Sequence, residues 1–285
     1  MPLNKACIGK NYVAPPIEVT LEAAQKYACA YNDSNPHYFD PAIPGGMVAP
    51  PMFAVVATWM PLLSAMTDPD LHADLLRLLH SAQDMEFLVP ICAGDIISAT
   101  ATISSIGSAI GGESMAVGLE ARNQRDEVVN RTTFTVLIRG RRGPGMLRES
   151  KDLSGSVARP EAILVVDQHI DPDQTFRYAE ASGDRNPIHV DENVAKMAGL
   201  TGIILHGLCT MAFTSKVMID NLCNGDPKRL KRLAVRFSRP VFPGDTITTT
   251  VWPDDVREER RTFVYETCNA NGHAVIRDGL AEIAT

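Results

Sequence analysis

The sequence predicts an α+β fold made of two tandem copies of one domain, each an antiparallel sheet wrapped around a central helix. Three observations predict it: a long internal repeat, an apolar stretch of helical length, and short runs in which apolar residues alternate with polar ones. The length of 285 residues also suits two domains of ordinary size.

The repeat is visible in two separate segments. Residues 27–40 align with residues 178–191, and the two share Tyr, two Ala, Asp, Asn, Pro and Asp in register at an offset of 151 (178 − 27). Residues 87–97 align with residues 237–247 at an offset of 150 (237 − 87), and both contain Phe, Pro, Gly-Asp and Ile. Two nearly equal offsets indicate a duplicated domain.

The segment between the copies is rich in Gly, Ser and charged residues, which is typical of a linker. We therefore expect a first domain over residues 1–140, a linker over residues 141–159, and a second domain over residues 160–285. Each domain then has a size at which domains commonly fold.

Within the second copy, the pattern predicts three helices. Residues 175–182 suggest a short helix, followed by a turn-rich loop at residues 183–187, and Asp191 is placed to cap a second helix that ends near Gly199. Residues 208–219 are apolar on almost every face, and a helix of this kind is buried.

The rest of the second copy alternates as strands do, at residues 233–237, 247–251 and 263–267. Asn271-Gly272 follows the last of these runs and is a strong signal for a hairpin. An antiparallel sheet around one buried helix satisfies both patterns.

Composition excludes several classes of protein. Lys and Arg total 27 against 34 for Asp and Glu, which gives a net charge of −7 without long blocks of one sign and argues against a nucleic-acid partner. The six cysteines are scattered without a C-x-x-C pair, which disfavours a zinc site or a disulfide framework. Without a signal peptide, a membrane-length apolar run or a peroxisomal address, a cytoplasmic protein with no membrane partner is expected.

One set of motifs in the second copy resembles a known family. Tyr178-Ala-Glu-Ala-Ser-Gly-Asp-Arg-Asn-Pro-Ile-His-Val-Asp191 is followed in order by Ala198-Gly199-Leu200, the segment 204–208 and Gly244-Asp245. This order resembles the MaoC-like dehydratases, the (R)-specific enoyl-CoA hydratases, in their double-hotdog form. The resemblance covers essentially the whole chain. It implies a hydro-lyase of fatty acid metabolism that reversibly hydrates trans-2-enoyl-CoA to (R)-3-hydroxyacyl-CoA, with an acyl-CoA thioester as substrate and no cofactor.

The same resemblance implies the catalytic residues. Asp184 and His189 correspond to the catalytic pair, Asn186 shapes the loop, and the Gly207 N–H lies in the oxyanion hole. These groups suit the chemistry, because hydration needs a proton removed from water, a proton delivered to C2, and stabilisation of charge on the thioester oxygen. An N–H at the start of a buried helix is aimed for the last task. Which of Asp184 and His189 is the base stays open.

Further residues are candidates for substrate binding. His206 is interpreted mainly as a loop-structuring residue, with a direct role in the site as the alternative. Lys231 and Arg232 are candidates for the coenzyme A phosphates, although a charge run is more often a solvated face. No metal site is expected, because His189 and His206 lack a Glu or a further His at ligand spacing.

The first copy has kept only part of the motif. Asp33 and Asn35 persist, but Tyr38 stands at the position of His189, and tyrosine is a poor base with an ordinary pKa near 10. If a five-residue deletion is allowed, Pro51 aligns with Gly207, and proline has no N–H to donate.

The first copy is therefore predicted to be a non-catalytic half that receives the acyl chain, with Tyr38 and Pro51 in its remodelled interior. We also expect Pro61 to interrupt the helix that follows Pro51, which would leave a shorter helix and more room. This arrangement predicts one active site per chain.

Other functions remain open from the residues alone. The same groups could hydrate a specialised branched or dicarboxylic enoyl thioester, since specificity depends on the shape of the pocket. A non-catalytic acyl-thioester binding protein and a hotdog thioesterase are weaker alternatives, given the complete hydratase motif. By the resemblance, the two hotdog halves pair within one chain, while a homodimer and acyl carrier protein in place of coenzyme A stay open.

Overall fold

The structure, a computed structural model, describes residues 2–140, 161–257 and 259–285. The predicted linker at residues 141–159 lies outside them. In the described residues, no helix is long and apolar enough to cross a membrane.

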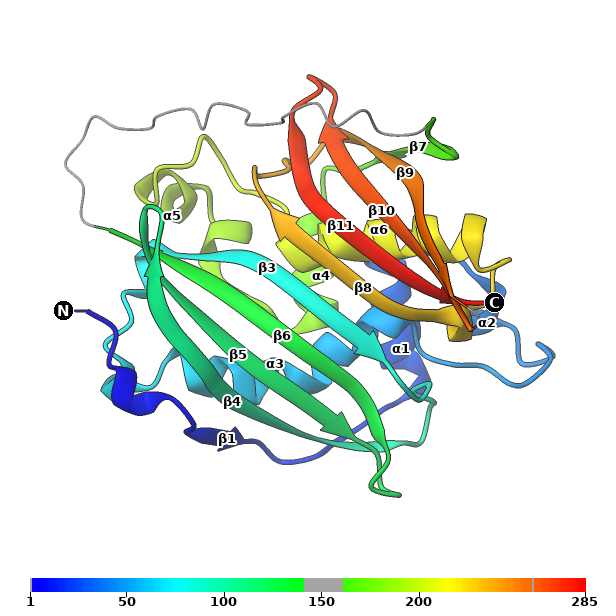
Figure 1. The fold of residues 1–285 in the computed structure, drawn as a ribbon, viewed down its shortest axis with the longest axis horizontal. Helices are drawn as coiled ribbons and strands as arrows, with labels where there is room; N and C mark the ends of the chain where they lie inside the picture. The colour runs from blue at the N-terminus through cyan, green and yellow to red at the C-terminus, as the bar shows by residue number, and fades with distance from the viewer. Residues whose placement is uncertain (1, 141–160, 258) are drawn as a thin grey trace.

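An eleven-stranded antiparallel sheet runs through the described parts of the chain, with the helices behind it (Figure 1). Its path is β1-β4-β5-β6-β3-β8-β11-β10-β9-β7, and β2 pairs with β4 beside it. The strands of the first copy are β1 (Asn11–Val13), β2 (Ile17–Glu18), β3 (Leu78–Phe87), β4 (Ile96–Ala109), β5 (Gly112–Arg122) and β6 (Val128–Arg139). Those of the second are β7 (Leu164–His169), β8 (Leu230–Phe237), β9 (Thr246–Arg257), β10 (Arg260–Asn269) and β11 (Ala274–Ala284).

The helices lie on one face of this sheet. They are α1 (Leu21–Cys29), α2 (Pro36–Phe39), α3 (Ala54–Met66), α4 (Gln174–Ser182), α5 (Glu192–Met197) and α6 (Gly207–Leu222). Short 3₁₀ turns include η2 (Pro51–Phe53), η5 (Pro187–His189) and η6 (Pro227–Arg229), besides η1 (Lys5–Cys7), η3 (Pro69–Leu71) and η4 (Leu75–Arg77). The three helices predicted for the second copy and the hairpin at Asn271-Gly272 are confirmed.

The two copies join edge to edge through β3 and β8. In this antiparallel pair Asp84 lies opposite Ala234, and these residues are 150 apart (234 − 84), which is the offset of the repeat. Equivalent residues therefore face each other, so a pseudo-two-fold axis passes through the sheet at this point. The predicted double-hotdog fold, with its two halves paired inside one chain, is confirmed.

Helix α6 is the buried central helix of the second copy. Most of its side chains are buried, Cys209, Met211, Ala212 and Ile219 fully, and they pack against the inner face of β8 to β11. Burial of this kind stabilises the helix far more than its own propensity does. Its first residue, Gly207, is thereby held in a defined position.

The expected interruption at Pro61 is wrong. Helix α3 continues through Pro61 to Met66, because tertiary burial of this apolar helix outweighs the loss of one backbone hydrogen bond. At 13 residues α3 is shorter than α6, with 16, since its first turn is the separate 3₁₀ turn η2. No additional space arises from a break at Pro61.

Candidate active site

The loop after α4 takes its shape from two successive side-chain turns. Gly183 ends α4 with a left-handed φ of 81°, a conformation that glycine adopts without strain. An Asp184 carboxylate oxygen then accepts the N–H of Asn186 at 3.1 Å, and the Asn186 side-chain oxygen accepts the N–H of Ile188 at 3.3 Å. These turns lead directly into η5, which carries His189. The Asn186 side chain therefore contributes a turn to this loop.

His189 is almost fully buried, with 7% of its surface exposed. Its Nδ1 lies 2.8 Å from the carbonyl oxygen of Ile204. Because a carbonyl only accepts hydrogen bonds, Nδ1 carries the proton in the neutral ring and Nε2 keeps its lone pair. Burial lowers the pKa of His189, and the neighbouring Asp184 carboxylate opposes that shift.

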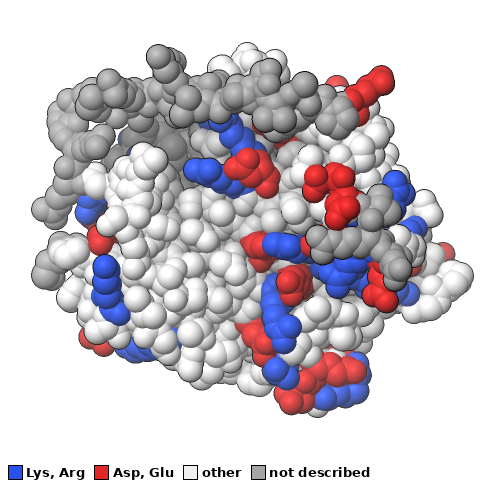
Figure 2. All heavy atoms as spheres, viewed as in Figure 1, with Lys and Arg blue, Asp and Glu red and all other residues white. Residues whose placement is uncertain are grey.

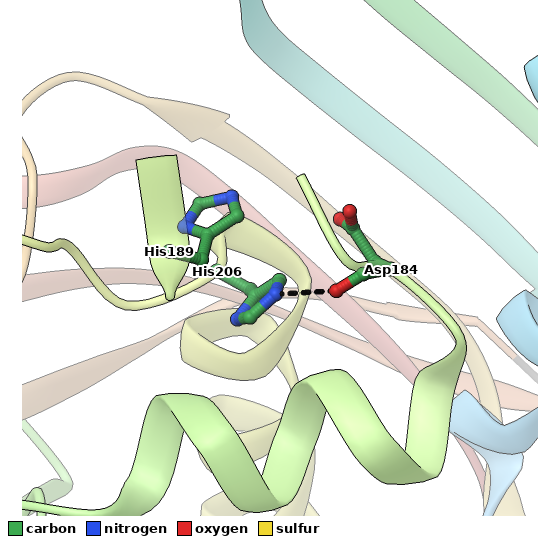
Figure 3. A group of neighbouring side chains, drawn as sticks. All are labelled: Asp184, His189 and His206. Carbon is green, nitrogen blue, oxygen red and sulfur yellow. Dashed lines mark hydrogen bonds between the residues drawn. The ribbon is translucent and has the colours of Figure 1, made fainter. Parts of the chain in front are cut away.

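Asp184 shows the opposite shift. Burial raises the pKa of the carboxyl group above 3.8, against the influence of His189 and of the Asn186 N–H. Figure 3 shows the Asp184 carboxyl group and the His189 ring on the same side of the His206 ring, which stacks against His189. A carboxylate and an imidazole with mutually dependent titration are a common acid–base arrangement.

His206 is fully buried beneath this pair. Its ring centroid lies 3.8 Å from that of His189, with 26° between the ring planes. Its Nε2 is 2.9 Å from the main-chain oxygen of Asp184, and its Nδ1 is 3.3 Å from Oγ1 of Thr175. With both ring nitrogens in contact with protein groups, His206 is not free to bind substrate. These contacts join His206 to the Asp184 loop and to α4, and its interpretation as a loop-structuring residue stays a prediction.

The cluster of Asp184, His189 and His206 has the side chains that a metal ion requires, with one ligand atom of each within 4.8 Å of the others. A metal needs an unprotonated nitrogen from each histidine. His206 faces a carbonyl oxygen with Nε2, which must be protonated, and Nδ1 faces the Thr175 hydroxyl. Only Asp184 and His189 then remain as metal ligands, and two ligands are fewer than a protein metal site ordinarily has.

Gly207 begins α6 immediately after His206. Within the described residues, its N–H and that of Leu208 have no hydrogen-bond acceptor, as expected for a helix N-terminus. A Cβ atom on residue 207 would lie 3.3 Å from the ring of Phe237, which requires glycine here or a shift of that ring. The free N–H and the helix dipole make this a suitable place for a developing oxyanion.

The first copy has the same loop with different side chains. Asp33 accepts the N–H of Asn35 at 3.0 Å, and the Tyr38 N–H bonds the Asn35 carbonyl as the His189 N–H bonds that of Asn186. Tyr38 thus occupies the position of His189. It is buried, and burial raises the pKa of its hydroxyl well above 10, so it is no base at neutral pH.

Pro51 occupies the position of Gly207. The N–H of Ala49 bonds the carbonyl of Ile91, and the N–H of Leu205 bonds that of Val241, so the residues two places further on are equivalent. The alignment with a five-residue deletion is therefore confirmed. As the first residue of η2, Pro51 presents no N–H.

Lys231 and Arg232 lie in different surroundings, and their assignment to the coenzyme A phosphates stays a prediction. The Arg232 guanidinium bonds both carboxylate oxygens of Asp84, at 2.9 and 2.7 Å, and Glu282 at 3.0 Å, so three of its five N–H groups are engaged by these carboxylates. Lys231 and Pro51 line a cavity of about 30 Å³. Asp184, His189 and Gly207 are not among its lining residues. On the sheet face in Figure 2, acidic and basic side chains lie side by side rather than in blocks of one sign.

Three contributors to the site were missed from the sequence: Thr175, the Ile204 carbonyl and Phe237. Phe237 lies within the second repeated segment, which was a usable signal, but only its contact with Gly207 gives it meaning. A backbone carbonyl has no residue signature. Thr175 was assigned only to the start of a helix, and its hydroxyl contacts depend on the fold.

The double-hotdog fold defines a class of proteins, and solved structures share it. One solved MaoC-like dehydratase superimposes with a TM-score of 0.83 over 98% of both chains, at 22% identity. A Mycobacterium tuberculosis protein described as a double hotdog fold gives 0.62 at 13% identity, over 97% of this chain and 96% of the other.

Sequence comparison identifies the family within this class. Residues 158–272 match the MaoC like domain, and residues 6–132 match the FAS1-like, dehydratase domain region. The peroxisomal enoyl-CoA hydratase 2 of Arabidopsis thaliana is 31% identical over 76% of this chain and 73% of its own length. The 3-hydroxyacyl-thioester dehydratase Y of Mycobacterium tuberculosis is 30% identical over 72% of each. The peroxisomal multifunctional enzyme type 2 of Mus musculus is 30% identical, and the match spans 29% of its length. The chain belongs to the MaoC-like dehydratase family.

Proposed function

We propose that the protein reversibly hydrates trans-2-enoyl-CoA to (R)-3-hydroxyacyl-CoA. The observation that carries this proposal is the pairing of Asp184 with His189, which places a carboxylate oxygen and a ring nitrogen within 4.8 Å of each other. One water molecule can bond both groups across such a separation, because each of its hydrogen bonds spans about 2.7–3.2 Å.

The protons balance within this pair. The water gives one proton to the Asp184–His189 pair as its oxygen bonds C3 of the enoyl group, and the pair returns one proton to C2. The π electrons of the double bond pass into the thioester as the C3–O bond forms and then make the new C2–H bond. The reverse sequence eliminates water from the hydroxyacyl thioester.

Charge that develops on the thioester oxygen is assigned to the Gly207 N–H. A donor at a helix N-terminus needs no reorganisation during the reaction, and loss of one such donor typically costs about 100-fold or more in rate. Together with Asp184, His189 and the loop residue Asn186, it completes the set of groups that hydration requires.

The names of the relatives support both directions of this reaction. The Arabidopsis relative is called an enoyl-CoA hydratase 2 and the mycobacterial relative a 3-hydroxyacyl-thioester dehydratase. The (R) configuration and coenzyme A as the carrier are part of the proposal.

We assign the catalytic role to residues 160–285, with residues 141–159 as a linker. Residues 1–140 are proposed as a non-catalytic half that receives the acyl chain, because Tyr38 and Pro51 supply neither a base nor an oxyanion donor. This division predicts one site per chain, and a titration that finds two sites would overturn it.

The test is incubation with crotonyl-CoA and longer enoyl-CoAs, with enoyl absorbance and free thiol followed together. Loss of absorbance without thiol release supports hydration, whereas thiol release identifies a thioesterase. Binding without either change identifies an acyl-thioester binding protein. Oxidation of the product by an (R)-specific but not an (S)-specific 3-hydroxyacyl-CoA dehydrogenase tests the configuration, and branched, dicarboxylic and carrier-protein thioesters test the substrate class.

A further inference from the structure

We propose that His206, supported by Thr175, is a positioning residue that keeps Asp184, His189 and the Gly207 N–H in register. This inference rests on the proposed function. It concerns how the reacting groups are held and not which groups react.

The first contact fixes Asp184. The loop that carries it is largely exposed at Arg185, Asn186 and Pro187. Within this loop the Asp184 side chain is held by the turn to Asn186, but the His206 Nε2–H also holds the Asp184 main chain at 2.9 Å. His206 directly precedes Gly207 in the chain, so this bond ties the carboxylate to the start of α6.

The second contact fixes His189. The hydrogen bond from His189 Nδ1 to the Ile204 carbonyl does not by itself stop the ring from turning about the axis of that bond. The His206 ring, whose centroid lies 3.8 Å from that of His189, limits this rotation. The His206 ring also contacts the Tyr178 ring, with the centroids 5.0 Å apart. A side chain locked on several sides by packing gives a reacting neighbour a defined orientation.

Thr175, in helix α4, contacts the same two histidines. Its Oγ1 lies 2.9 Å from the main-chain oxygen of His189 and 3.3 Å from Nδ1 of His206. Thr175 is fully buried in α4. Its single hydroxyl hydrogen can be donated to one of these two acceptors at a time, so Thr175 lies in hydrogen-bond contact with both histidine residues.

The first copy provides an internal comparison. It retains the turn from Asp33 to Asn35, at 3.0 Å, but Pro50 stands at the position of His206 and Ala24 at that of Thr175. The loop therefore forms without either supporting residue. Both supports are found only in the copy that has the acid–base pair, which points to a role in the chemistry and not in folding of the loop.

The experiment compares four variants of the full chain with wild type, using crotonyl-CoA to measure kcat and KM and thermal unfolding to measure stability. His206→Leu removes the donor and the ring, and His206→Gln keeps a donor that can reach the Asp184 carbonyl. Thr175→Val removes one hydroxyl with little change in shape. Thr249→Val is the matched control, because Thr249 is equally buried. Its hydroxyl forms a hydrogen bond of 2.9 Å with the Thr267 hydroxyl and none with this cluster.

We expect His206→Leu to lower kcat about 100-fold, the cost of a reacting group displaced by about 1 Å, with KM changed less than about threefold. His206→Gln should recover about tenfold of that loss, and Thr175→Val should lower kcat about tenfold. Thr249→Val should lower stability alone.

Three results would overturn the inference: wild-type kcat in His206→Leu, a loss confined to KM, or equal activity in the Gln and Leu variants. If His206→Leu does not fold, Thr175→Val decides, and wild-type kcat in that variant overturns the proposal. Wild-type protein without hydratase activity would instead refute the proposed function, so the two failures are distinguishable.

Discussion

The hydroxyl groups of Tyr27 and Tyr178 lie 2.9 Å apart in the fully buried core, and the two residues are 151 positions apart in the chain. This separation is the offset of the repeat, so the same residue of each copy meets its counterpart on the pseudo-two-fold axis. The ring centroids are 5.6 Å apart. Burial raises the pKa of both hydroxyls, which keeps them protonated and able to share one hydrogen bond.

Replacement of either tyrosine by phenylalanine leaves the other hydroxyl buried and unpaired. Each single variant should lower the free energy of unfolding by about 1–3 kcal/mol, and the double variant by less than the sum of the two. Urea unfolding of all four proteins measures this coupling. Strictly additive losses would show that the two hydroxyls do not interact.

The repeat predicts that Tyr27 and Tyr178 are equivalent, but it does not predict that they touch. Equivalence is a property of the sequence, whereas contact depends on where the pseudo-two-fold axis passes. The fold class is predictable from the repeat, while the buried helix α6 and the Asp184 loop are predictable from local signals. These signals are a stretch that is apolar on almost every face, and a turn-rich segment with Asp and Asn before a proline.

The surroundings of charged and aromatic side chains are less predictable. Lys231 and Arg232 lie adjacent in the sequence and belong to one charge run, yet Arg232 meets Asp84 and Glu282 while Lys231 lies beside Pro51. Alternate residues of a strand point to opposite faces, and their partners come from distant strands. The stack of His206 on His189 likewise joins residues that only the folded loops bring together.

Asp184→Asn should lower kcat/KM for crotonyl-CoA by about 100-fold or more, because it removes an acid–base group while its shape is preserved. The matched control is Asp33→Asn, which makes the same change at the equivalent position of the first copy. We expect that variant to keep kcat within about twofold of wild type. Similar losses in both variants would mean that both copies are catalytic.

The same Asp184→Asn variant should be more stable than wild type at neutral pH. Burial raises the folded-state pKa of Asp184 above its unfolded value of 3.8, so the folded state binds the proton more tightly. The stability that this group contributes is present below pH 3.8 and is lost as the pH rises through the raised pKa. Asparagine stays neutral throughout.

Urea unfolding between about pH 4 and pH 7 measures this difference, which should be largest at pH 7 and shrink as the solution is acidified. A stability gain that is independent of pH would indicate a packing effect, and a loss at pH 7 would contradict the raised pKa.

Gly207→Ala tests the start of α6. The added Cβ would lie 3.3 Å from the Phe237 ring, so either the ring or the first turn of the helix must shift. We expect a stability loss of about 1–3 kcal/mol from overpacking, and a kcat at least about tenfold lower because the N–H moves from the thioester oxygen. Gly202→Ala is the control, since its Cβ would lie 3.5 Å from the Glu192 carboxylate, an ordinary contact.

A second change separates these two effects of Gly207→Ala. Phe237→Leu in the Gly207→Ala background replaces the flat ring with a smaller side chain, which should restore part of the lost stability by relieving the contact at 3.3 Å. If relief of that contact also returns the N–H to its place, kcat should rise with stability. Recovery of stability without recovery of kcat would show that Phe237 itself contributes to the site, and no recovery of either would rule out the ring as the cause.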